Sequence, residues 1–178
     1  MISPVEVWSK ELMGLAPEAG PRQLRDEQIR RAMATAEYAL AHSAFYRQAW
    51  GGRLPEDFFS LPALAPRDFS ALWCQPQSRI VRIVTLNTSG STGSPKRVAF
   101  SQVDLERTLR FFAVGLGQLF SPGERALCLL PGTAPHGVAD LIRRALSDLG
   151  VTCAHRDSPE AAQGEYDGVI AMPVQALR

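Results

Sequence analysis

The sequence predicts an α/β protein in which an N-terminal helical segment precedes a mostly parallel sheet flanked by helices. Two observations predict this fold class. Apolar runs typical of strands alternate with helical patterns after residue 79, whereas the strongest periodic signal before that point is helical. We therefore expect two parts, an arm with a helical segment at 1–78 and an α/β subdomain at 79–178.

The N-terminal part is predicted to begin as a loose arm over 1–21, where prolines and glycines are frequent, with one helical turn around Trp8. Residues 22–50 follow as a helix, because apolar residues recur there at spacings of three and four. The Gly51–Gly52 pair ends this pattern. Four prolines in 53–78 favour short helical turns that lie against a core.

The α/β part contains apolar stretches that predict strands at 79–86, 98–100, 125–130, 151–155 and 168–172. Helices are predicted from 101 to about 120 and from 137 to 149. The second helix has the cleaner pattern, since Val138 and five other apolar residues share one face. Gly150 stands where a C-terminal glycine cap belongs.

Composition indicates an ordinary globular protein, with 46% apolar and 21% charged residues. Nineteen basic and eighteen acidic residues leave a net charge of +1, which argues against a nucleic-acid partner. No run has the length of a membrane span or a signal peptide, so we expect no membrane partner and a cytoplasmic location. Cys74, Cys128 and Cys153 are odd in number and widely spaced, which predicts reduced thiols.

The most specific feature is a segment rich in glycine and hydroxyl residues between the first two predicted strands, TSGSTGSPK at 88–96. Glycines allow the backbone N–H groups to turn inward, hydroxyls offer further donors, and Lys96 adds a positive charge. These groups predict a phosphate site for a nucleoside triphosphate. An ordinary hairpin loop is the competing interpretation. The order fits neither the Walker pattern nor the dinucleotide fingerprint, since Gly90 and Gly93 are close together and Pro95 precedes the lysine.

The segment resembles the phosphate-binding loop of the adenylate-forming superfamily, the acyl- and aryl-CoA ligases, whose pattern reads T-S-G-[ST]-T-G-x-P-K. Every fixed position of that pattern is filled here, by Thr88, Ser89, Gly90, Ser91, Thr92, Gly93, Pro95 and Lys96. Weaker likenesses to the phenylacetate-CoA-ligase-like branch occur at 41–47, 61–69 and 166–173.

This resemblance implies that the chain is an incomplete part of the large N-terminal domain of an adenylate-forming enzyme. Such enzymes use ATP and Mg²⁺ to convert a carboxylic acid to an acyl-adenylate and then transfer the acyl group to coenzyme A. The implied substrate is an aryl or small acyl acid. The implied contacts to the ATP phosphates come from Thr88, Ser89, Gly90, Ser91, Thr92, Gly93 and Lys96. The adenylation lysine of the family lies in a C-terminal domain, so no catalytic residue or metal ligand is assigned here.

His136 is a candidate for the acyl pocket, because many family members carry a histidine or aromatic residue between the corresponding strand and helix. A capping or solvated histidine near a helix N-terminus is the alternative. We expect His42 and His155 to be structural and Asp140 to lie on the solvent-facing side of its helix.

Members of the superfamily are several hundred residues long, and much of their acid pocket, adenine site and hinge has no counterpart before Arg178. We therefore expect an N-terminal fragment that is inactive alone. Its expected partners are a small carboxylic acid and either a second copy, as a homodimer, or the remainder of its own chain. Two alternatives stay open: adenylation with another thiol or amine as acceptor, and a non-catalytic nucleotide-binding remnant.

Overall fold

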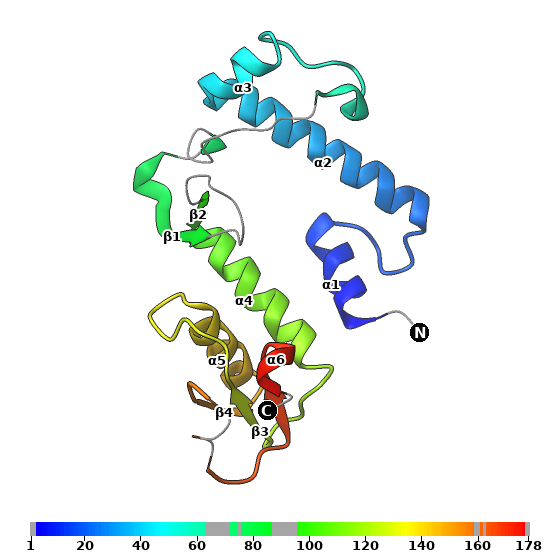
Figure 1. Cartoon of the computed structure of the whole chain (residues 1–178). Coiled ribbons are helices and arrows are strands. Elements are labelled where there is room, and N and C mark those ends of the chain that lie inside the picture. Colours follow the sequence, from blue (N-terminus) through cyan, green and yellow to red (C-terminus); the bar gives the residue numbers. More distant parts are fainter. Residues whose placement is uncertain are drawn as a thin grey trace. The chain divides into compact units, whose positions relative to one another are not determined.

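A computed structural model describes residues 3–62, 72–74, 76–86, 96–158, 161 and 163–176. The chain divides into two compact units, one formed by Lys10–Gln102 and one by Met1–Ser9 together with Val103–Arg178. Figure 1 shows their helices and strands in order along the chain. The architecture is mixed α/β with helices and a parallel sheet, which confirms the predicted fold class. In the described parts, none of the helices combines the length and the apolar character needed to cross a membrane.

The N-terminal arm is more helical than predicted, because α1 runs over ten residues, Pro4–Met13. Proline is well tolerated in the first turn of a helix, where its missing N–H has no intrahelical partner anyway. Pro4 therefore begins the helix instead of breaking it. Gly14 follows the last helical residue with a φ of 71°, a conformation that favours glycine.

The predicted helix over 22–50 is two helices, α2 (Pro21–His42) and α3 (Ala44–Ala49). The break lies at Ser43, whose backbone is extended and whose hydroxyl accepts a hydrogen bond from the Tyr46 N–H at 3.4 Å. Serine at this position caps the new helix. A short 3₁₀ turn, η1 (Phe58–Ser60), contacts α2 further along the chain.

Two strands of the same unit form an antiparallel hairpin, β1 (Ile80–Leu86) and β2 (Lys96–Ser101), which a 3₁₀ turn, η3 (Gln77–Arg79), precedes. Residues are paired from Ile80↔Ser101 to Leu86↔Lys96, with an irregularity near Arg82. Both strands were predicted, and β2 is longer than its prediction at both ends.

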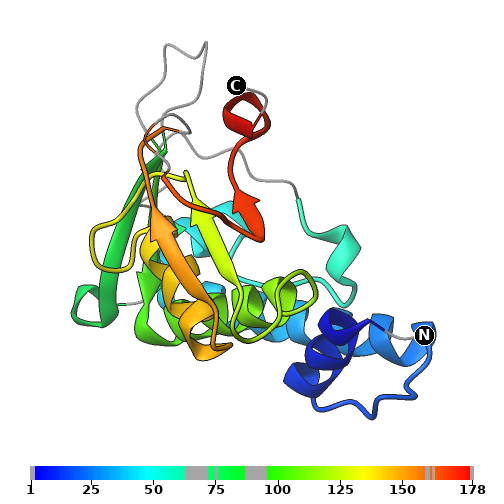
Figure 2. The same cartoon turned by 90° about the horizontal axis from the view of Figure 1, so that it is seen from below.

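The other unit contains a parallel sheet in the order β4-β3-β5. Its strands are β3 (Arg125–Cys128), β4 (Thr152–His155) and β5 (Gly168–Ile170), and its helices are α4 (Gln102–Leu116), α5 (Val138–Asp148) and α6 (Pro173–Ala176). Figure 2 shows β3 and β4 side by side with α5 next to them. The core cluster joins this helix and sheet through Phe120, Ala126, Cys128, Ala139, Ile142, Leu146 and Val151.

The apolar stripe predicted on α5 is confirmed, since Leu141, Ile142 and Leu146 are all at most 4% exposed. Val138 departs from it, because this first residue of the helix is 41% exposed. Gly150 has a φ of 76° and ends the helix as predicted.

Two thiols lie in the sheet core. Cys128 is buried in β3, and Cys153 is half-buried in the neighbouring β4, where it pairs in register with Ala126. Burial and the nearby Cys128 raise the pKa of Cys153 from 9.0 to about 11, against a smaller opposing effect of Arg143. A group buried in its neutral form resists ionisation in this way.

We expect the free energy of unfolding to fall as the pH rises from 9 to about 11, because the native chain keeps a proton on Cys153 that the unfolded chain loses. Urea unfolding at intervals across this range measures the fall. In each protein the fall is the free energy of unfolding at pH 7 minus the value at the higher pH. This fall should be smaller in Cys153→Ala than in the wild type. Equal slopes in the two proteins would contradict the assignment.

Candidate functional site

The β1–β2 hairpin determines where the glycine-rich segment begins and ends. Leu86 pairs with Lys96, so residues 87–95 connect two neighbouring strand ends. The predicted phosphate contacts Thr88, Ser89, Gly90, Ser91, Thr92 and Gly93 lie outside the described residues. Lys96 is the first residue of β2. The structure therefore brings both ends of the segment together, and the phosphate contacts stay a prediction.

Trp73 fixes the start of β2. Its indole N–H donates to the carbonyl oxygen of Arg97 at 3.3 Å, and the Arg97 guanidinium lies 5.7 Å from the centre of the indole ring. The second contact has the geometry of a cation–π interaction. Two contacts from one side chain thus hold the residue that follows Lys96, next to the end of the glycine-rich segment.

In the other unit, His136 lies in a tight turn between β3 and α5. Among the described residues it is the one non-glycine with a positive φ, 63°. Such a backbone conformation is strained for a side chain as large as histidine and is over-represented at functional sites. The N–H of His136 donates to a carboxylate oxygen of Asp140 at 3.0 Å, which holds the turn in place.

Two glycines make this turn possible. A Cβ atom on Gly137 would collide with the carbonyl oxygen of Gly132, and Gly132 itself has a φ of 93°. The N–H of Asp140 donates to that same carbonyl at 3.2 Å, while the N–H of Gly137 donates to Ala134 at 2.8 Å. The path of the chain from β3 into α5 is therefore closely defined by its own backbone.

Asp140 lies in a different environment from the one that its sequence position predicts. It was expected on the solvent-facing side of α5, but its side chain is only 11% exposed and also binds Arg143 at 2.7 Å. Burial opposes ionisation of Asp140, yet the hydrogen bonds from Arg143 and from the His136 backbone, with the charges of Arg143 and Arg144, outweigh it and leave its pKa below 3.8. An acidic residue three positions after the Gly137 cap is the signal that indicates such a role.

The imidazole of His136 differs from those of His42 and His155 in its hydrogen bonding. Its Nδ1 is buried and has no hydrogen-bond partner within the described part of the chain. By contrast, a ring nitrogen of His155 donates to the carbonyl of Leu130 at 2.8 Å, and Nδ1 of His42 donates to the carbonyl of Tyr38 at 2.8 Å. His136 thus keeps a buried polar atom that a ligand or a further segment of protein could satisfy.

The carboxyl ends of β3, β4 and β5 meet at one edge of their sheet because the strands are parallel. In open parallel sheets, ligands bind outside the carboxyl ends of the strands. The binding crevice lies where the connections from two neighbouring strands run to opposite sides of the sheet. The turn that carries His136 departs from this end of β3. Gln175 joins the neighbouring chain ends, since its amide donates to the carbonyl of Leu129 at 3.1 Å and accepts the Met172 N–H at 3.0 Å.

Metal binding by side chains alone finds no support here, since no group of three or more histidine, cysteine or acidic side chains gathers in the described residues.

Most of the chain matches part of a solved enzyme. The chain has the fold of a segment of 2-hydroxyisobutyryl-CoA ligase. Its structure in complex with 2-HIB-AMP and CoA in the thioesterification state matches with a TM-score of 0.55 and 21% identity, over 81% of this chain and 33% of that chain. The open conformation of the same enzyme with the same ligands matches with a TM-score of 0.55 and 18% identity. This match covers 78% of this chain and 36% of that chain.

A third structure of this ligase, in the postadenylation state with 2-HIB-AMP, gives a TM-score of 0.53 and 20% identity over 83% of this chain and 32% of that one. The chain thus spans about a third of the length of the solved structures it matches. No protein-family model and no curated protein matches the sequence. Likeness at this level of identity establishes the fold.

Replacing Asp140 by alanine removes the acceptor of the His136 N–H and the partner of Arg143. We expect a loss of about 1–2 kcal/mol in the free energy of unfolding at pH 7, measured with urea. The loss should shrink as the pH falls below 3.8, because the lowered pKa makes the carboxylate stabilising only above that range. Asp148→Ala is the matched control, since Asp148 is exposed near the end of the same helix.

Proposed function

We propose that this chain is part of an ATP-dependent acyl-CoA ligase. In the proposed reaction a carboxylic acid is activated with ATP to an acyl-adenylate, and coenzyme A then displaces AMP. The observation that carries the proposal is the β1–β2 hairpin, which brings together both ends of a segment that fills every fixed position of the adenylate-forming phosphate loop. The shared fold with 2-hydroxyisobutyryl-CoA ligase supports the same class.

The glycine-rich segment would hold the triphosphate. An antiparallel hairpin suits this task, because two paired strands anchor both ends of a loop whose backbone N–H groups must converge on the phosphates. We propose contacts from Thr88, Ser89, Gly90, Ser91, Thr92, Gly93 and Lys96. A Mg²⁺ ion bound to the phosphate oxygens would share their charge.

The turn around His136 would face the acid. It departs from the carboxyl edge of a parallel sheet, holds a buried nitrogen without a partner, and is fixed by Asp140. Such a preorganised polar group can orient a substrate at little entropic cost. We propose His136 as an acyl-pocket residue on these grounds.

The narrower assignments rest on the sequence segments given above. We propose an aryl or small acyl acid as the substrate, a phenylacetate-CoA-ligase-like branch, and a cytoplasmic enzyme. The segments at 1–78 and 79–178 would belong to one larger adenylation domain, completed by a longer chain or, as a homodimer, by a second copy.

Lys96→Ala in the complete ligase should raise the KM for ATP by about tenfold or more, because a charge-assisted contact to phosphate contributes about 1.5–3 kcal/mol. Formation of acyl-CoA from a panel of aryl and short-chain acids measures the effect. Arg53→Ala is the control, since it removes an exposed basic residue of the same unit outside the glycine-rich segment and its two strands. Equal ATP kinetics in the wild type and Lys96→Ala would contradict the phosphate role of this segment.

A further inference from the structure

A cavity of about 430 Å³ lies within the unit Lys10–Gln102, beside α2, α3 and η1. Its aromatic lining is formed by Tyr46, Trp50, Phe58 and Phe59. Small side chains of α2 leave the space open, among them Ala36 and Ala39, which are 5% and 6% exposed. A concave, mostly apolar space of this volume is typical of small-molecule sites.

The aromatic rings of this cavity are tilted against one another. The Tyr46 and Trp50 ring centres are 4.7 Å apart at an angle of 42°, and Phe58 and Phe59 meet edge to face. The guanidinium of Arg25 lies 5.5 Å from the centre of the Phe59 ring. This lining suits a flat apolar group, which can stack against rings of this kind.

One residue that lines the cavity, Trp50, carries an unsatisfied donor. The indole Nε1 of Trp50 is buried and has no acceptor among the residues that the structure describes. A buried N–H without a partner costs about 1–3 kcal/mol. The indole as a whole is only partly buried and lines the cavity, so a ligand bound there would lie against this ring.

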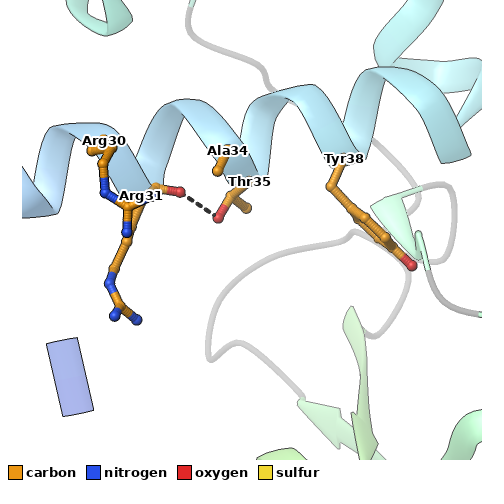
Figure 3. Close-up of a pocket in the computed structure, with 5 residues that line it drawn as sticks. All are labelled: Arg30, Arg31, Ala34, Thr35 and Tyr38. Atoms are coloured by element: carbon orange, nitrogen blue, oxygen red, sulfur yellow. Dashed lines mark hydrogen bonds between the residues drawn. The ribbon is translucent and has the colours of Figure 1, made fainter. Parts of the chain in front are cut away.

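A second cavity of about 510 Å³ lies along the adjacent side of α2 (Figure 3). It is lined by Arg30, Arg31, Ala34, Thr35 and Tyr38. Thr35 lines both cavities, so the two spaces adjoin at this residue. The basic side chains of the second cavity thus lie next to the aromatic side chains of the first.

The charge of the second cavity is positive. The carboxylate of Glu27 binds both Arg30 and Arg31 at 2.6 Å, so one negative charge faces two positive ones. Hydrogen bonds from Arg30 and Arg31 lower the pKa of Glu27 from 4.5 to about 2, which keeps it ionised at neutral pH. The cluster therefore has a net charge of +1 and can still attract an anion.

We propose that the two adjoining cavities form one binding site for an amphipathic anion, a small molecule with a flat apolar body and a single anionic group. The apolar body lies among Tyr46, Trp50 and Phe58, and the anionic group lies beside Arg31. A polar atom between the two accepts the Trp50 N–H. This site uses no residue assigned to the ligase reaction and does not depend on that reaction.

Titration with 8-anilinonaphthalene-1-sulfonate tests the site, because this probe joins a flat apolar body to one anionic group. The readout is the indole N–H resonance of Trp50 in a ¹H–¹⁵N spectrum, assigned with Trp50→Phe. We expect the probe to shift this resonance before those of Trp8 and Trp73. Arg31→Gln, at a partly exposed position, should weaken binding by about fivefold, the effect of a single charge contact near the surface.

Two controls separate this site from general adsorption. Arg22→Gln removes an exposed charge of α2 outside both cavities and should leave the affinity unchanged. The uncharged probe N-phenyl-1-naphthylamine should bind the wild type and Arg31→Gln equally. Binding that is insensitive to Arg31→Gln, or that leaves the Trp50 resonance unmoved, would overturn the proposal. A dilution series without probe is a further control. If dilution alone shifts the Trp50 resonance, a second copy of the chain covers this face and the proposal is overturned.

Discussion

The pairing of β3 with a parallel strand on each side is the constraint on which the α/β unit depends. Because β3 is central, its residues Ala126, Leu127 and Cys128 are almost fully buried. The apolar face of α5 must then cover the sheet, and Leu146 does so with no exposed surface. Both the core and the place where the chain leaves β3 follow from this arrangement.

The strained turn at His136 is a consequence of that geometry. The chain passes from β3 to α5 through residues 129–137, and in this connection Gly132 closely approaches Gly137 and His136 takes a positive φ. Asp140 lies in the first turn of α5, where an acidic residue interacts favourably with the positive end of the helix dipole. One carboxylate thereby stabilises the helix and fixes the histidine.

The β1–β2 hairpin lies outside the parallel sheet and depends on other contacts for its stability. Its two strands form a sheet of their own, and such a pair has little stability unless other groups support it. Trp73 supplies one support through its contacts with Arg97. The result is a pair of anchored strand ends on either side of a glycine-rich connection, the arrangement on which the proposed handling of ATP rests.

Periodicity predicted α5 and β3 well, because these two elements are largely buried and burial leaves an apolar pattern in the sequence. It failed at Ser43, where one hydroxyl ends α2 and begins α3 inside an otherwise helical pattern. It failed at Asp140 too, since the group that this carboxylate binds is a backbone N–H placed by a left-handed residue. The cavity beside Trp50 brings the aromatic residues of α3 and its C-terminal cap together with those of η1, and no local sequence pattern predicts such a contact.

The central claim is that this chain belongs to an enzyme that activates a carboxylic acid as its adenylate. Exchange of labelled pyrophosphate into ATP by the complete protein tests it most directly, because the exchange needs the first half-reaction and no coenzyme A. We expect exchange that depends on a carboxylic acid and on Mg²⁺. Absence of exchange with every aryl and short-chain acid tried, in a protein that still binds ATP, would contradict the claim.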